Sequence, residues 1–272
     1  MTGHDSGPRG LPGIDTGKPH PARMYDWFLG GKDNYPVDEE MGRQLLALEP
    51  RLPVMARVNR AFMHRATRWL AGRGVRQFLD VGTGIPTEPN LHQVAQGIAP
   101  ASRVVYCDND PIVLAHAEAL LRGTPPGVTE YLQADARDPD AILEQARLVL
   151  DFGEPVAVSL IALLHFVTDD DGAYALVRRL MSELPPGSHL VLSHASADFT
   201  PDTAKEAGDL YRSREVPLAL RSREEVTRFF DGLDLVEPGV VVVDRWHPEL
   251  GDPVPGQHDG PIPGYGAMGR KP

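Results

Sequence analysis

Three aspartates follow short apolar segments of the chain. Asp80 ends the segment QFLD, Asp108 ends RVVYCD, and Asp135 follows YLQA. If each apolar segment is a strand of a parallel sheet, the three carboxylates lie along one edge of that sheet. Strand ends also favour acids because the next helix needs a cap, and that explanation suits Asp110 and Asp138, which each precede a proline. It explains the first three less well, so we expect them to form a ligand site.

A glycine turn follows the first apolar segment. Gly82 and Gly84 enclose Thr83 in the stretch DVGTGIPT, and glycine lets the backbone turn sharply and approach a ligand closely. We expect Thr87 to cap a helix that runs from 88 to 97. A strand, a glycine turn and a helix N-terminus together form a corner that binds nucleosides, although a glycine pair alone also occurs in plain connections.

The acids indicate which nucleoside would bind. Asp108 lies 28 residues after Asp80, and in nucleoside-binding folds an acid about 20 residues along accepts hydrogen bonds from ribose hydroxyls. A dinucleotide would bring a pyrophosphate, which Asp80 and Glu88 would repel, and Thr87 stands where G-x-G-x-x-G requires its third glycine. S-adenosylmethionine carries an ammonium and a sulfonium, and carboxylates suit both. The pattern therefore favours S-adenosylmethionine over NAD.

Two groups of motifs resemble known families. FLDVGTGIPTEPNLH, VVYCDND and YLQADARDP occur in this order and resemble the first three motifs of class I S-adenosylmethionine-dependent methyltransferases. The stretch ARMYDWFLGGKDNYPVDEEMG resembles the N-terminal signature of a bacterial family of S-adenosyl methyltransferases, formerly a domain of unknown function. The similarity continues to the final GYGAMGRKP. The resemblance implies a methyltransferase with an added N-terminal helical region and an unassigned acceptor.

The resemblance also implies which residues contact the cofactor. They lie at or near the ends of the first four strands: Asp80, Gly82, Thr83 and Gly84 at the methionine moiety, Asp108 at the ribose hydroxyls, Asn109, Asp135 and Ala136 at the adenine, and Ser159 and Leu160 at the inner side of the cofactor. In the N-terminal signature, Lys32 is a candidate partner of the methionine carboxylate. Tyr25 and the neighbouring aromatic residues either pack a short helix or form a lid whose rings face the sulfonium through cation–π attraction.

A catalytic base is optional for methyl transfer, because aligning the donor and the acceptor can supply much of the rate. His165 follows the fourth apolar segment, where it could deprotonate an acceptor hydroxyl. The alternative, which we favour, is a buried histidine in a helical turn. His194, after the fifth segment, has the same two interpretations. The expected acceptor is a small molecule.

Other catalytic chemistries find little support in the chain. His247, Asp252, His258 and Asp259 share a loop, but their spacing matches no metal-ligand pattern, so we expect no metal. No G-x-S-x-G elbow is present. Cys107 is the only cysteine and lies within a predicted strand, so we expect a core residue rather than a nucleophile.

Composition narrows the class of partner. The 272 residues carry a formal net charge of −11, which argues against general nucleic-acid binding. An exception is a run of seven arginines without an intervening acid, which we interpret as a solvated helix face rather than an entry for an anionic substrate: Arg51, Arg57, Arg60, Arg65, Arg68, Arg73 and Arg76. No signal peptide or membrane-spanning apolar run is apparent, so we expect a cytoplasmic protein.

Alternating strands and helices predict an α/β fold with a doubly wound, mostly parallel, Rossmann-like sheet and helices on both faces. The resemblance implies seven strands, the last antiparallel. We expect further strands over 155–161, 189–193, 240–246 and 265–270. Helices are expected over 55–71, 110–123, 140–150, 168–183 and 222–230, the last with a capping box of Ser222 and Glu225. The long loop 247–264 is either a functional flap or an unconstrained excursion.

These elements divide the chain into a disordered tail over 1–18, an N-terminal helical cap over 19–74 and a class I methyltransferase domain over 75–272. Two other functions remain open from the sequence. One is a non-catalytic protein that senses S-adenosylmethionine, and the other is an NAD-dependent oxidoreductase.

Overall fold

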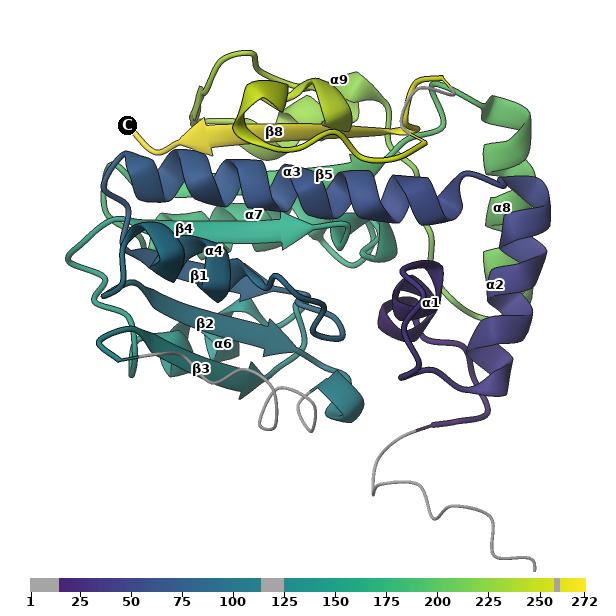
Figure 1. Cartoon of the computed structure of the whole chain (residues 1–272), viewed down its shortest axis with the longest axis horizontal. Helices are drawn as coiled ribbons and strands as arrows, with labels where there is room; N and C mark the ends of the chain where they lie inside the picture. Colours follow the sequence, from purple (N-terminus) through teal and green to yellow (C-terminus); the bar gives the residue numbers. More distant parts are fainter. Residues whose placement is uncertain (1–14, 114–124, 257–259) are drawn as a thin grey trace, which may run out of the picture.

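A central sheet of eight strands organises the chain (Figure 1). The structure is a computed structural model, and it describes residues 15–113, 125–256 and 260–272. The strands are β1 (Gln77–Val81), β2 (Arg103–Asp108), β3 (Val128–Gln133), β4 (Val156–Ile161), β5 (His189–Ala195), β6 (Asp234–Leu235), β7 (Val241–Val242) and β8 (Gly264–Arg270). They lie in the order β3-β2-β1-β4-β5-β8-β6, and β7 also pairs with β8. The first five pair in parallel and β8 runs antiparallel to β5, which confirms the predicted fold class.

The sixth strand differs from its prediction. Instead of one strand over 240–246, two short strands, β6 and β7, pair with β8 at separate points, and Val243–Arg245 forms a 3-10 turn. The cause is Arg65, whose guanidinium binds the carbonyls of Val243 and Trp246 at 2.8 Å each. Those carbonyls are therefore held by a side chain of α3 (Leu52–Gly72) rather than by a strand ladder.

Helices cover both faces of the sheet. The first face packs against α3 and α4 (Leu91–Ile98) through alternate strand residues such as Phe78 and Val104. The residues next to them, Leu79 and Val105, belong to the core under α6 (Pro139–Ala146), α7 (Ala173–Ser182) and α9 (Arg223–Thr227) with its 3-10 extension Arg228–Phe230. This alternation is the two-sided burial that the apolar segments predicted.

Two helices begin later in the chain than the sequence predicts. The helix after the glycine turn begins at Leu91, because Asn90 rather than Thr87 forms the capping box, together with Gln93. The helix predicted from 168 begins at Ala173. Thr168 and the carboxylate of Asp171 bind each other in a turn before it, and Gly172 enters the helix with φ at +79°.

The third strand spans Val128–Gln133, three residues earlier than expected, so Asp135 lies beyond its end. The Ser222–Glu225 capping box is confirmed. The helix expected over 110–123 is described only at 111–113, and its remainder falls outside the described residues.

A second layer of helices lies at the carboxyl ends of the parallel strands (Figure 1). It consists of α1 (Pro21–Phe28), α2 (Pro36–Leu48) and α8 (Pro201–Ser213). Met24, Phe28 and Leu45 form its core, and Tyr211 of α8 packs against that core. We predicted no helix over 201–213. The division at residue 74 stays a prediction, and α3 contributes both to this layer through Ala56 and to the sheet.

The arginine run is a solvated face only in part, because Arg57, Arg73 and Arg76 are exposed whereas the other four arginines are buried or half-buried. Arg65 is buried, and Arg68 donates to the carbonyl of Leu250 at 3.1 Å, in the loop whose 3-10 turn is Pro248–Leu250. Arg51 binds the carbonyl of Pro261 at 3.2 Å. Arg51 and Arg68 therefore hold the described part of the loop 247–264 against α3 and its start. This part of the loop is not an unconstrained excursion.

Within the described ranges, no helix is both long and apolar enough to cross a membrane.

Candidate active site

A cavity of about 320 Å³, here called the polar cavity, opens at the carboxyl ends of β1, β2 and β4. Its lining includes nine of the residues predicted to contact the cofactor: Tyr25, Asp80, Gly82, Thr83, Gly84, Asp108, Asn109, Asp135 and Ala136. These residues come from α1, from the ends of β1 and β2 and from the loops after β1, β2 and β3, so the fold brings together groups that the sequence separates by up to about a hundred positions.

The glycine turn is bound to β2 through its backbone. The N–H groups of Gly82 and Thr83 both donate to the carbonyl of Cys107, at 2.8 and 3.2 Å. The N–H of Gly84 donates to Oδ2 of Asp108 at 2.8 Å. Phosphate-binding loops present free N–H groups to their anion. Here all three are taken, so the turn offers no such cradle to a pyrophosphate.

Both strand-end acids are buried in the cavity wall. Besides the Gly84 contact, Oδ1 of Asp108 accepts from the N–H of Asp110 at 3.0 Å. Burial raises the pKa of Asp108. Burial also raises the pKa of Asp80 to about 7, against the opposing effect of the Arg60 guanidinium. A cation that enters the cavity would restore the ionised form of both carboxyls.

Three of the predicted cofactor residues do not line the polar cavity. Ser159 and Leu160 are buried inside β4, and Lys32 is exposed on the cap. The end of β4 instead contributes Ile161, Ala162 and Leu163. Ala162 has φ at +54°, a strained value for a residue with a side chain. Its N–H donates to Oγ of Ser193 at 2.9 Å, which holds the turn in place.

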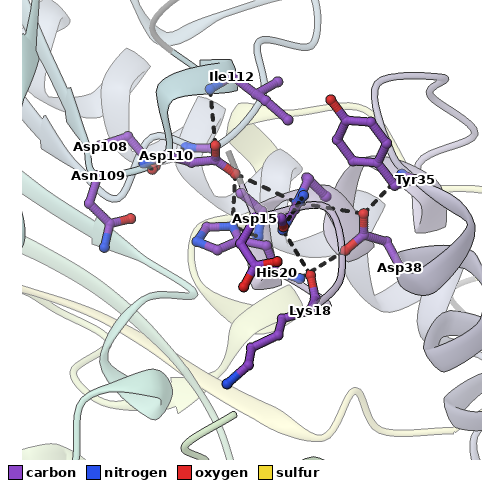
Figure 2. A network of polar contacts seen from close by, with 12 residues as sticks. Asp15, Lys18, His20, Tyr35, Asp38, Asp108, Asn109, Asp110 and Ile112 are labelled. Carbon is purple, nitrogen blue, oxygen red and sulfur yellow. Dashed lines mark hydrogen bonds and ion pairs between the residues drawn. The ribbon is translucent and has the colours of Figure 1, made fainter. Parts of the chain in front are cut away.

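An ion-pair network joins the N-terminal cap to the loop after β2 (Figure 2). Arg23 is buried, and its Nε lies 3.5 Å from Oδ2 of Asp38 and 3.7 Å from Oδ2 of Asp110. Nδ1 of His20 lies 3.2 Å from the same Asp110 oxygen, and the His20 N–H donates to Asp38 Oδ1 at 2.8 Å. Because Asp110 also binds Asp108, the cap and the cavity acids form one connected unit.

The same network includes residues 15–18 of the predicted tail, and the boundary of that tail stays a prediction. The carbonyls of Asp15 and Lys18 accept hydrogen bonds of 3.0–3.2 Å from Arg23, so residues 15–18 are fixed against the cap. Residues 1–14 of the predicted tail lie outside the described residues.

Sequence reasoning missed several groups in the cavity wall, above all Arg60 and His20. Arg60 donates to the carbonyls of Thr87 and Pro89, and His64 contacts the Pro89 carbonyl at 2.8 Å. Thus α3 holds the segment that follows the glycine turn. The acid-free arginine run was the available signal for Arg60, but it did not reveal which arginine faces the cavity.

A second cavity of about 210 Å³, here called the apolar cavity, lies next to the first, between the cap helices and the ends of β4 and β5. The two share the wall residues Pro21, Tyr25, Asn59, Ala162 and Phe166. At this wall the polar groups bind one another. Tyr25 Oη donates to the carbonyl of Ala56 at 2.9 Å, and Asn59 Nδ2 donates to Tyr25 Oη at 3.0 Å.

The two candidate bases, His165 and His194, line the apolar cavity. His194 has both ring nitrogens engaged, Nδ1 with the Ala195 carbonyl at 2.7 Å and Nε2 with the Arg221 guanidinium at 2.9 Å. Burial lowers the pKa of His194 to about 4. Burial, aided by His194 and Arg221, holds the pKa of His165 well below its ordinary value. This environment agrees with the buried-histidine interpretation, and a role as base for His165 stays a prediction.

Within the described residues, no three His, Cys, Asp or Glu side chains gather as metal ligands; His258 and Asp259 lie outside them. Cys107 is buried in the core, and burial raises its thiol pKa to about 12, so the thiol is unreactive.

The sheet order and the cavity at its carboxyl edge define a Rossmann-like methyltransferase fold. Human N-acetylserotonin methyltransferase in complex with S-adenosylmethionine shares this fold, with a TM-score of 0.50 and 12% identity over 94% of this chain and 63% of that one.

The chain belongs to the S-adenosyl methyltransferase family, whose model matches residues 9–272. A DUF574-family protein from Streptomyces avermitilis is 49% identical over 95% of this chain and 99% of its own, with a TM-score of 0.90. A candidate methyltransferase from Thermobifida fusca is 38% identical over 96% and 97%, with a TM-score of 0.87. No curated protein is significantly similar. The protein is therefore an S-adenosylmethionine-dependent methyltransferase, as the motifs predicted.

Proposed function

We propose that the polar cavity is the S-adenosylmethionine site and that the protein methylates a small molecule bound next to it. When bound, the cofactor supplies a methyl group made electrophilic by its sulfonium. In our assignment, Asp80 and the glycine turn face the cationic methionine end. Asp108 accepts from the ribose hydroxyls, and Asn109, Asp135 and Ala136 border the adenine.

The observation that supports this assignment most strongly is that the N–H groups of the glycine turn already donate hydrogen bonds within the protein. Gly82, Thr83 and Gly84 donate to protein oxygens, and the acids around them suit a cation, not a diphosphate. The donor set therefore fits S-adenosylmethionine and disfavours NAD.

The methionine carboxylate needs a cation, and we assign that part to Arg60 in place of Lys32. Arg60 lines the polar cavity, whereas Lys32 is exposed and lines neither cavity. Arg60 is also anchored by the Thr87 and Pro89 carbonyls, which fixes its guanidinium beside the turn.

A small acceptor is supported by the second cavity, which adjoins the first and has a volume of about 210 Å³. The net charge of −11 gives no support to a nucleic-acid acceptor. Tyr25 and Phe166 lie in the wall between the cavities, where they would orient the acceptor and exclude water.

Calorimetry with S-adenosylhomocysteine tests the assignment. Asp108→Asn should weaken binding at least about tenfold, because hydrogen bonds to a charged group contribute about 1.5–3 kcal/mol. The matched control is Asp234→Asn, an exposed aspartate at the far edge of the sheet, which should bind normally. Undiminished affinity in Asp108→Asn, or tight NAD binding by the unaltered protein, would refute the proposed site.

A further inference from the structure

The apolar cavity has the size of a ring compound. Its walls come from α1, α2, α3, α8 and the loop before α9, with Met24, Phe28, Leu45, Leu52, Met55 and Leu220 among the lining residues. An apolar cavity of about 150 Å³ accepts benzene, so about 210 Å³ suits a compound of one or two rings.

The same cavity has no unpaired charge in its described lining. Glu49 is the charged side chain there, and it forms an ion pair with Arg51. Nη2 of Arg51 lies 2.8 Å from Oε2 of Glu49, and Nε of Arg51 donates to Oε1 of Glu49 at 2.9 Å. Both histidines are neutral at pH 7, since their pKa values are lowered. A charged acceptor would lose its hydration here without gaining a counter-charge.

His165 presents one unused polar atom. Its Nδ1 accepts a hydrogen bond of 3.5 Å from the Ala195 N–H, so in the neutral ring the proton belongs on Nε2. Nε2 has no hydrogen-bond partner among the residues described here and is not sealed in the interior. The ring lines the apolar cavity beside Phe166, whose centroid is 4.3 Å away.

The groups packed around His165 oppose its protonation. The His194 ring lies 5.5 Å away, centroid to centroid, and its Nε2 is occupied by the buried Arg221 guanidinium. Arg221 is in turn paired with Asp169. To act as a base, the His165 ring would have to take up a second proton and become a cation, and the Arg221 guanidinium beside the two histidine rings disfavours that cation. To donate a hydrogen bond, the neutral ring needs only the N–H that it already has.

We propose that the apolar cavity binds an uncharged methyl acceptor of one or two rings, and that His165 donates its Nε2–H to an oxygen of that molecule as a positioning residue. This inference rests on the proposed function, because it takes the neighbouring polar cavity as the cofactor site. It replaces the earlier hypothesis of a base with that of a hydrogen-bond donor.

Three naphthalene probes test the charge preference on the full chain saturated with S-adenosylhomocysteine. The neutral ketone 2-acetylnaphthalene should bind, whereas 2-naphthoate and 2-(aminomethyl)naphthalene should each bind at least about 100-fold more weakly. Ala204→Trp, which fills the cavity from α8, should abolish ketone binding but keep S-adenosylhomocysteine affinity. The matched control Lys205→Trp places the same ring on the exposed side of α8 and should bind the ketone normally.

The donor role has a spectroscopic signature. The carbonyl band of bound 2-acetylnaphthalene should shift to lower frequency, and His165→Phe should remove the shift, whereas His165→Gln, which retains an N–H donor, should preserve part of it. Equal affinity for ketone and naphthoate, or a band unchanged by His165→Phe, would overturn the proposal. Binding of S-adenosylhomocysteine is measured on its own, before the ketone is added. Its failure would contradict the proposed function, whereas a failure of ketone binding or of the band shift alone would contradict only the further inference.

Discussion

At the scale of single residues, the proposed cofactor site depends on two carboxyl groups whose burial opposes their ionisation. Asp80 and Asp108 are both more than nine-tenths buried, yet the ligand that they suit is cationic. A carboxylate kept out of water destabilises the unliganded protein and gains a partner only when the ligand arrives. Function and stability should therefore respond in opposite directions to the same substitution.

Asp80→Asn tests this opposition. The pKa of Asp80 is raised to about 7 in the folded chain, so the folded state holds an extra proton and its stability falls as pH rises from about 4 to 7. Asn cannot ionise, so the variant should be more stable than the original at pH 8, by up to about 4 kcal/mol, and similar at pH 4. Urea unfolding at both pH values measures the difference, with exposed Asp234→Asn as the control. An equal effect at both pH values would contradict the explanation.

The same carboxyl should make ligand affinity depend on pH. S-adenosylhomocysteine retains the methionine ammonium, which favours ionised Asp80, so its affinity should rise with pH up to about 7 and then level off. Calorimetry in buffers of different ionisation enthalpy should show proton release below pH 7. In Asp80→Asn both effects should disappear, and their persistence would assign the titration to another group.

The two turn glycines should respond differently to substitution. Both have positive φ, +72° at Gly82 and +67° at Gly84. A Cβ at Gly82 would also lie 2.6 Å from Cδ1 of Leu163, whereas at Gly84 the nearest side-chain atom is 3.9 Å away. Gly84→Ala should cost about 1 kcal/mol of strain, and Gly82→Ala about 1–3 kcal/mol more as Leu163 is displaced. Unfolding measurements in which the two variants are equally stable would rule out the steric part.

At the scale of elements, the cap is fastened to the sheet through a buried cation. Arg23 of α1 lies between Asp38 of α2 and Asp110 after β2, and both acids are buried. Because the backbone N–H of Asp110 donates to the carboxylate of Asp108, the position of the cap is connected to the shape of the polar cavity. We therefore expect the docking of the cap and cofactor binding to be coupled.

Arg23→Ala should leave two carboxylates buried without a cation, at a cost of about 3–5 kcal/mol. Cofactor affinity should fall as well, because His20 and Asp108 lose their fixed positions. The control is Arg43→Ala, which removes an exposed pair with Glu39 on α2 and should cost less than about 0.5 kcal/mol. Thermal unfolding and calorimetry distinguish the two variants, and similar losses would show that the buried network is not responsible.

The elements also show where sequence reasoning succeeds. Apolar segments that end in acid predicted β1 and β2 and the places of Asp80 and Asp108, because strand, turn and acid are neighbours in the chain. The contact of Arg65 with Val243, by contrast, spans 178 positions, and no local pattern reveals that it ends a strand. The same holds for α8, whose placement against the cap depends on Tyr211 meeting residues from the other end of the sequence.

At the scale of the whole molecule, two adjoining cavities give the cationic cofactor and the uncharged acceptor separate binding sites in our proposal. The polar cavity gathers acids from the strand ends, and the apolar cavity is enclosed by the cap, α3 and α8. Their common wall, formed by Pro21, Tyr25, Asn59, Ala162 and Phe166, is where a donor and an acceptor would meet. This arrangement gives a purpose to α1, α2 and α8, which lie at the carboxyl ends of the strands and enclose the apolar cavity.

The most direct measurement is a crystal structure of the full chain with S-adenosylhomocysteine. We expect the adenosine in the polar cavity, with its ribose hydroxyls within hydrogen-bond distance of Asp108 and its homocysteine next to the glycine turn, and we expect the adjoining apolar cavity to stay open. A nucleoside bound elsewhere would contradict the proposed site. So would a diphosphate coenzyme bound by the N–H groups of the glycine turn in place of their hydrogen bonds to Cys107 and Asp108.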